Sequence, residues 1–400
     1  MNFPKLFHFN STCEIAIANG SPYFNTSVLL NRFELDLTSI MGVFAKEGDY
    51  ILSEEKPSTD FLEKMMQLGL SKVNYVSLSE IKQMQLHEKE LIFNVQSWGG
   101  SPAENFYLRD IKKSEEQWDA QRTKIIERAF AVHLLEKGLR FDWNHSLIGS
   151  ENVLNCSILR TVEEAEKYLE MHFPVVFKSP FSSSGRGLLV LRKPILNDAN
   201  RKWITTILHQ QGYIVASAWL EKIQDLSFQF EKIDACIRFE GVSYFNTNSN
   251  GQYKEHVLNG HSFSLEEGET TINNFFLEQI GEQIRQTLSQ SELMTSFQGR
   301  FGVDALIYKE IGKLKVHPMV EINPRYTMGA VALSLQKIIH QEARGFYRMH
   351  AVGHESYQSF IEAKQLENPP VFVDGKLKSG VVSLTPFYQN AKFGAYLELF

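Results

Sequence analysis

The chain has 400 residues, of which 43% are hydrophobic, and its formal net charge is −6 at pH 7. This length is sufficient for roughly two or three domains, each with a hydrophobic core of its own. The sequence contains no long run of Lys and Arg. Nucleic acid and anionic membranes are therefore not expected as partners, because both require a basic surface.

The amino-terminal residues carry no sign of export. Residues 1–10 lack the basic segment and apolar core of a secretory signal peptide. No apolar run in the sequence approaches the roughly 20 residues that cross a bilayer. The cysteines Cys13, Cys156 and Cys236 form no CxxC pair, which is typical of a reducing compartment and argues against structural zinc. A cytoplasmic location is expected.

The first part of the chain alternates short apolar runs with amphipathic stretches, which is typical of an α/β domain. The apolar runs indicate β-strands, and two of the stretches between them indicate helices. The predicted strands are 6–9, 49–52, 73–76 and 91–95. The predicted helices are 61–68 and one that starts with 13–18 and ends at Asn19-Gly20. We therefore predict a small α/β domain over residues 1–115.

Residues 116–217 are predicted to form a second domain, which contains a loop rich in serine and glycine. A charged helix is predicted over 114–138, and Thr161-Val-Glu-Glu164 is a capping box that begins a second helix. The loop follows a buried strand at 175–177 and precedes a strand at 188–192. It thus joins two strands, whereas a Walker P-loop joins a strand to a helix and carries Gly-Lys-Ser/Thr.

Residues 218–400 are predicted to form a third domain, preceded by a strand at 213–216. Apolar residues recur every four positions between Ile272 and Leu288, which predicts an amphipathic helix. The further predicted elements are strands at 301–308 and 315–323, which neighbour each other across a turn at 312–313, and a helix at 328–339.

The segment Glu321-Ile-Asn-Pro-Arg325 places a carboxylate, an amide and a guanidinium at alternate positions. In a strand these side chains share one face, because the side-chain period is two. Glu321 and Asn323 offer oxygen ligands to Mg²⁺, and Asp304 could add a third if its strand pairs with theirs. Arg325 could bind a phosphate. Alternatively, Glu321 closes a hydrogen-bond network, Asn323 begins a turn and Arg325 forms a surface salt bridge.

The loop Ser182-Ser-Ser-Gly-Arg-Gly187 could fold its backbone N–H groups around phosphate oxygens. The alternative is a flexible hairpin tip. Lys178 lies at the end of the buried strand immediately before the loop, from where a lysine can reach a phosphate. This lysine makes the phosphate interpretation more specific.

These motifs, in this order, resemble the ATP-grasp superfamily. They are Val-Val-Phe-Lys-Ser-Pro with the following Ser-Ser-Gly-Arg-Gly, then Trp219-Leu220 with Asp225-Leu-Ser227, then Gly302-Val-Asp304, and finally Glu321-Ile-Asn323-Pro-Arg325. The resemblance covers about residues 115 to 340, with an α/β domain ahead of it where that superfamily usually has one. It implies an α+β fold in which antiparallel sheets clamp a nucleotide.

The resemblance also implies a role for each matched residue. Lys178 would contact ATP phosphates under a lid, a hinge would read adenine, and Asp225 would hold the ribose. Mg²⁺, or Mn²⁺ in its place, would be bound by Asp304, Glu321 and Asn323, and Arg325 would steady the transferring phosphoryl group. The lid residues are Ser182, Ser183, Ser184 and Gly185, the hinge residues are Ser217, Ala218 and Leu220, and a second phosphate contact is Arg122 or Lys124.

Two positions depart from the family pattern. Ser217 stands where a glutamate often contacts the adenine amine, which puts the selectivity for adenine in doubt. Ser179 stands where a proline commonly follows the lysine, with Pro180 one place later, so a shifted loop is expected.

The function that the resemblance implies is a ligase that joins a small-molecule carboxylate to an amine or thiol. ATP would phosphorylate the carboxylate, and the second substrate would attack the acyl phosphate, with release of ADP and phosphate. No side-chain nucleophile is needed. A kinase and a nucleotide-binding regulator are the alternatives, and a homodimer is compatible with all of them. The segment Asn10–Glu14 could line the substrate cleft, or Ser11 or Thr12 could only cap a helix.

Overall fold

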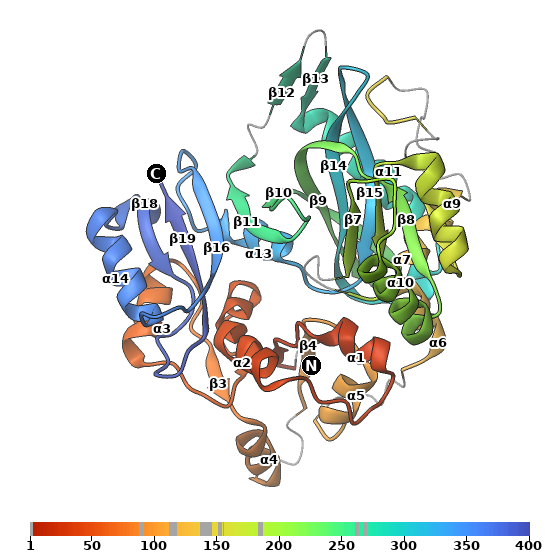
Figure 1. Ribbon diagram of the computed structural model, residues 1–400. Coiled ribbons are helices and arrows are strands. Elements are labelled where there is room, and N and C mark those ends of the chain that lie inside the picture. Colours follow the sequence, from red (N-terminus) through yellow and green to blue (C-terminus); the bar gives the residue numbers. More distant parts are fainter. Residues whose placement is uncertain are drawn as a thin grey trace. The chain divides into compact units, whose positions relative to one another are not determined.

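The computed structural model describes residues 3–87, 92–111, 118–136, 146–150, 154, 156–182, 187–260, 264–267 and 270–400 (Figure 1). It combines helices with antiparallel sheets, which confirms the predicted fold class. None of the described helices is long and apolar enough to cross a membrane.

The chain forms two compact units. We call Met1–Trp118, Glu255–Gly260 and Tyr326–Phe400 the terminal unit, and Asp119–Lys254 with His261–Arg325 the central unit. This division differs from the three predicted domains, since residues after Arg325 group with the amino-terminal residues. The reason is long-range packing that a linear sequence does not display.

The terminal unit contains a parallel sheet of order β3-β2-β1-β4. Its strands are β1 (Lys5–His8), β2 (Tyr50–Leu52), β3 (Asn74–Val76) and β4 (Asn94–Ser97), and its helices are α1 (Cys13–Asn19), α2 (Val28–Leu37), η1 (Thr38–Phe44), α3 (Thr59–Gln67), α4 (Leu78–His87) and α5 (Pro102–Tyr107). Helix α1 ends at Gly20, whose φ of 76° is the left-handed conformation that glycine adopts most readily. The predicted βαβ alternation is thus found in this region.

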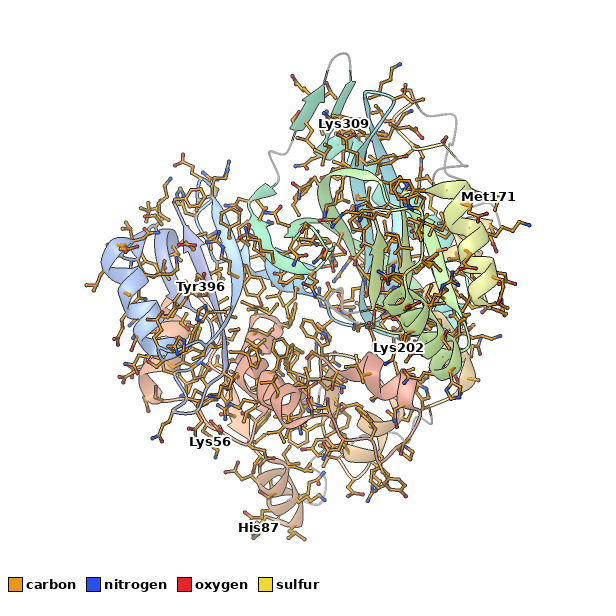
Figure 2. The ribbon with its side chains drawn as sticks, viewed as in Figure 1. Lys56, His87, Met171, Lys202, Lys309 and Tyr396 are labelled. Atoms are coloured by element: carbon orange, nitrogen blue, oxygen red, sulfur yellow. The ribbon has the colours of Figure 1, made fainter. Side chains whose placement is uncertain are left out.

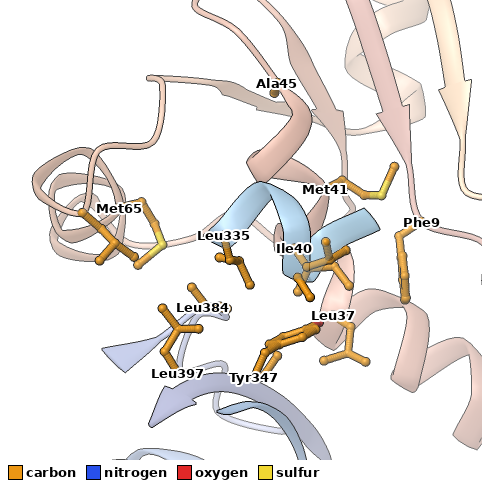
Figure 3. Close-up of a cluster of buried hydrophobic side chains, with 14 of the residues drawn as sticks. Phe9, Leu37, Ile40, Met41, Ala45, Met65, Leu335, Tyr347, Leu384 and Leu397 are labelled. Carbon is orange, nitrogen blue, oxygen red and sulfur yellow. The ribbon is translucent and has the colours of Figure 1, made fainter. Parts of the chain in front are cut away.

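An antiparallel sheet completes the terminal unit. Its strands, in spatial order, are β11 (Tyr253–Leu258), β16 (Gly345–Ala351), β19 (Phe393–Leu399), β18 (Lys376–Ser383) and β17 (Val371–Val373), with helices α13 (Met328–Leu335) and α14 (Tyr357–Glu367). Figure 3 shows the core that joins this sheet to η1 and α13, in which Ile40, Leu335 and Leu397 are fully buried. This shared core explains why residues 326–400 belong with the amino-terminal residues.

The central unit contains two antiparallel sheets. The smaller has the order β5 (Ser157–Leu159), β8 (Ile214–Ala218), β6 (Val175–Lys178), β7 (Leu188–Leu191). Helices α9 (Val162–His172) and α10 (Asp198–Gln211) pack on it through Ala165 and Ile204. Met171 on α9 and Lys202 on α10 point away from this core into solvent (Figure 2).

The larger sheet of the central unit carries the predicted metal-binding strands. Its order is β15 (Lys313–Asn323), β14 (Gly299–Glu310), β9 (Glu221–Ile233), β10 (Cys236–Thr247). The remaining elements of the unit are α6 (Ala120–Ile126), α7 (Arg128–Glu136), α11 (Asn274–Leu288), α12 (Leu293–Ser296), and the hairpin of β12 (Ser264–Glu267) and β13 (Thr270–Asn273). The apolar face of α11 buries Ile280, Ile284 and Leu288, as the spacing of the apolar residues predicts, and also Leu277. Ile272, the first residue of the predicted series, lies in β13 ahead of the helix.

The single helix predicted over 114–138 is wrong within the described part of that range. Helix α6 ends at Ile126 and α7 begins at Arg128, because Glu127 has an extended backbone between them. The backbone N–H of Arg128 donates to the carbonyl oxygen of Pro180 at 3.2 Å. A tertiary contact therefore begins the second helix, and it places the Arg128 side chain beside the serine-rich loop.

Candidate active site

The pairing of β14 with β15 brings the three predicted metal ligands together. Asp304 lies opposite Glu321, and Gly302 lies opposite Asn323. The amide Nδ2 of Asn323 donates to Oδ2 of Asp304 at 3.0 Å. Residues that pair directly project from the same face of a sheet. Two carboxylates and an amide therefore share one face, although the described residues contain no cluster of three or more His, Cys, Asp or Glu that could hold a metal.

The electrostatics of this face fit a divalent cation. Burial, and then repulsion by Glu321, raise the pKa of Asp304 to about 7. Two facing, partly buried carboxylates are costly when both are ionised, and a bound cation removes that cost. The donors are all oxygen atoms, as Mg²⁺ prefers. Asp304, Glu321 and Asn323 therefore fit a magnesium site.

Replacing Asp304 by Asn is expected to stabilise the metal-free protein at pH 8. The carboxyl pKa is raised from 3.8 in the unfolded chain to about 7 in the fold. The folded state therefore binds more protons between these pH values, and wild-type stability falls as the pH rises from about 4 to about 7. At pH 8 the free energy of unfolding of Asp304→Asn should exceed that of wild type by on the order of 2 kcal/mol. This figure is discounted because the Asp304 side chain is partly exposed.

Urea unfolding with EDTA at pH 5 and pH 8 measures this effect. The difference between Asp304→Asn and wild type should grow with pH, and added Mg²⁺ should reduce it by stabilising the wild type alone. A difference that is equal at both pH values would show that the Asp304 carboxyl is not electrostatically destabilised.

Arg128 is a candidate site residue that the sequence analysis missed. Its side chain is 6% exposed, and its Nε lies 3.0 Å from Oε1 of Glu321. Its Nη1 donates to the carbonyl oxygen of Ser179 at 2.6 Å and to Oγ of Ser182 at 2.8 Å. Arg128 thus links Glu321 of β15 to the first residues of the serine-rich loop.

Arg128, rather than Lys124, is the basic residue of this segment that contacts the predicted site. Lys124 is exposed, and Arg122 is partly buried with its backbone N–H donating to Oδ1 of the helix cap Asp119. The only signal in the sequence was a charge at a helix position flanked by apolar Ile125 and Ala129. A lone arginine on an apolar face is a sign of a buried partner.

Lys178 lies at the end of β6 and is 9% exposed. Its side chain forms no hydrogen bond or ion pair with any residue that the structure describes, although its backbone pairs with β7 and β8. Burial lowers its pKa and the charge of Arg128 lowers it further, whereas Cys156 and Glu321 raise it by a smaller amount. A buried ammonium group that lacks an anionic contact is suited to a phosphate oxygen.

The base of the serine-rich loop is closely packed. The backbone N–H of Ser179 donates to the carbonyl oxygen of Gly187 at 2.9 Å. A Cβ on Gly187 would collide with the side chains of Ser179 and Ser182, so any larger residue here would displace both serines. The predicted lid residues Ser183, Ser184 and Gly185 lie outside the described residues.

The predicted hinge follows β8. Ser217 pairs with Val176, and the backbone N–H of Trp219 donates to the carbonyl oxygen of Pro174 at 2.8 Å. Ala218 is the last residue of the strand, and the carbonyl oxygen of Leu220 accepts from the N–H of Lys222 at 2.8 Å. The chain thus passes directly from the smaller sheet into β9 of the larger one.

Asp225 and Arg325 both have partners. Oδ2 of Asp225 accepts from Nζ of Lys222 at 2.6 Å and from Oγ1 of Thr247 at 2.9 Å. Nη2 of Arg325 donates to Oδ1 of Asn323 at 2.9 Å. Arg325 therefore lies beside Asn323, one of the predicted metal ligands, whereas Asp225 belongs to a separate polar group on β9 and β10.

The segment Asn10–Glu14 belongs to the terminal unit. Asn10 joins two loops, since its Nδ2 donates to the carbonyl oxygen of Gly99 at 2.6 Å and its Oδ1 accepts from the N–H of Gly99 at 3.0 Å. Thr12 is the N-cap of α1 but makes no side-chain capping bond, and its N–H donates to Oε1 of Glu34 at 2.7 Å. The alternative that Ser11 or Thr12 caps this helix is therefore not supported for Thr12.

Comparison of the sequence with protein families and with curated proteins finds no match. Solved structures do resemble the chain. Biotin carboxylase from Campylobacter jejuni, in a complex with β,γ-ATP, has a TM-score of 0.51 at 13% identity, with 99% of this chain and 87% of that chain covered. L-amino acid ligase from Bacillus licheniformis has a TM-score of 0.49 at 10% identity, with 100% and 94% covered. At these identities the likeness concerns the fold.

Proposed function

Because the chain has the ATP-grasp fold, we propose that it is an ATP- and magnesium-dependent ligase. It would join a small-molecule carboxylate to an amine, or to a thiol, and release ADP and phosphate. The observation that carries this proposal is the meeting of Asp304, Glu321 and Asn323 with Arg128 and Arg325. Such a set of acidic and basic side chains suits a metal-bound polyphosphate. The expected location of the protein is the cytoplasm.

The metal would be held by Asp304, Glu321 and Asn323. When bound, Mg²⁺ or Mn²⁺ would offset negative charge on the β- and γ-phosphates. Arg128 already contacts Glu321 and the loop, and it could turn from either to a phosphate without leaving the site. Arg325 would hold the transferring phosphoryl group from the side of Asn323.

The nucleotide would be held between the two sheets of the central unit. Lys178 would bind a phosphate, because its buried ammonium group has no anionic contact within the described residues. Leu220 and Ala218 would contribute backbone groups for the base, and Asp225 would exchange Thr247 or Lys222 for a ribose hydroxyl. The loop that begins at Ser182 would exclude water.

The reaction would proceed in two transfers. The substrate carboxylate attacks the γ-phosphorus in line, so that a C–O–P link forms and the bond to the ADP oxygen breaks. The amine then attacks the acyl carbon, loses a proton and displaces phosphate. Exclusion of water protects the acyl phosphate between the transfers.

Release of ADP and phosphate from Mg²⁺-ATP tests the proposal against pools of carboxylates, with and without amines and thiols. A ligase requires both components. A phosphorylated product without free phosphate would instead identify a kinase, and nucleotide binding without turnover would identify a regulator. For an active pair, a carboxylate labelled with ¹⁸O should transfer one labelled oxygen to the released phosphate, and unlabelled phosphate would contradict the acyl-phosphate route.

A further inference from the structure

His317 is a buried histidine that the proposed reaction does not use. Its side chain lies on β15 and is 5% exposed. The ring atom Nδ1 is fully buried and, apart from a contact of the ring with the backbone of His317 itself, has no hydrogen-bond partner among the described residues. Buried polar groups are nearly always hydrogen-bonded, so an exception calls for a missing partner.

The sheet register places His317 in a row of its own beside the metal ligands. Leu306 on β14 pairs with His317 on one side and with Asp225 of β9 on the other. Asp304 pairs in the same way with Glu321 and with Ser227. We call the row of Glu321, Asp304 and Ser227 the metal row. The row that contains His317 lies two residues further along β14, a distance of about 7 Å. Both rows project from the same face.

The order of the two rows assigns them to different parts of a nucleotide. The metal row would hold the end of the triphosphate, and Asp225, in the other row, is the proposed ribose contact. His317 shares the row of Asp225 and is displaced from Glu321 in the direction of the nucleoside. It is also close enough to Lys178 for that ammonium group to lower its pKa, after burial as the larger cause.

We propose that His317 is a nucleoside-binding residue, whose ring donates to or accepts from the nucleoside half of the bound nucleotide. This inference rests on the proposed function and adds a residue to it. Burial lowers the pKa of the ring to about 3, so the imidazole is neutral and offers one donor and one acceptor. His317 on the larger sheet would supply a polar contact to the nucleoside from the side opposite the predicted hinge at Ser217.

Calorimetric titration of ADP and ATP into His317→Phe, His317→Asn and wild type tests this role. His317→Phe keeps a planar ring without hydrogen-bonding atoms. It should raise the dissociation constants of ADP and ATP about tenfold, by the same factor with and without Mg²⁺. His317→Asn should recover part of the loss. The matched control is His209→Phe, an exposed position on α10, which should bind like wild type.

Ligand-free stability separates binding from folding. His317→Phe should unfold at the wild-type urea midpoint or above it, because the change removes a buried group without a partner. Unchanged nucleotide affinity in His317→Phe, or a loss seen only with Mg²⁺, would overturn the inference while leaving the proposed function intact. Failure of the wild type to bind either nucleotide would overturn both.

Discussion

Replacing Glu321 by Gln is expected to reduce Mg²⁺-ATP turnover at least about 10³-fold, because metal-assisted charge stabilisation contributes several kcal/mol. The substitution preserves the shape of the side chain and removes its charge. Glu321 faces Asp304 across the strand pair and binds Nε of Arg128 at 3.0 Å. Its loss therefore removes a metal ligand and the charge that orients Arg128. Steady-state ADP release measures the effect.

The matched control for this variant is Glu310→Gln. Glu310 lies on β14, outside the proposed site, and accepts from Oγ of Ser150 at 2.9 Å. It should retain turnover close to that of wild type. Both variants should show a cooperative unfolding transition. Turnover near the wild-type value in Glu321→Gln would rule out the metal assignment.

Replacing Arg128 by Ala is expected to lower stability and turnover together. The variant leaves Glu321 without its buried cation and removes donors to Ser179 and Ser182. Breaking a buried ion pair costs about 3 kcal/mol, and the loss of a phosphate-stabilising cation should lower turnover by about 10²-fold or more. Arg128→Lys should recover little of the lost stability or turnover, because one ammonium group cannot contact Glu321, Ser179 and Ser182 together.

Lys124→Ala is the control, since Lys124 is exposed on the preceding helix. It should keep the wild-type urea midpoint and turnover. The comparison also decides which basic residue of this segment serves the site. Loss of turnover in Lys124→Ala, with Arg128→Ala active, would favour the assignment made from the sequence over the one made from the contacts.

Local pattern predicted much of the fold. The four-residue spacing of apolar residues gave helix α11, and alternation within 315–323 gave a strand that places Glu321 and Asn323 together. These features depend on a few neighbouring residues. The sequence therefore predicted the strands β14 and β15 and the lysine that ends β6. The metal-binding role of the two strands stays a prediction.

The features that were missed depend on contacts between distant residues. Arg128 begins a new helix because its N–H meets Pro180, and no local pattern announces that contact. His317 pairs with Leu306 only because the register shifts between Asp304 and Leu306. The shift places His317, four residues before Glu321, one row from the metal ligands. The break has no signature in the sequence, whereas the bulge has one in Pro318, because proline within a strand occurs at edges and bulges.

Calorimetric titration of ADP with and without Mg²⁺ tests the central claim that the central unit holds a magnesium-nucleotide site. Wild type should bind ADP, Mg²⁺ should strengthen binding about tenfold or more, and Glu321→Gln should lose that enhancement while still binding ADP alone. Absence of ADP binding to wild type, or equal enhancement by Mg²⁺ in both proteins, would contradict the account.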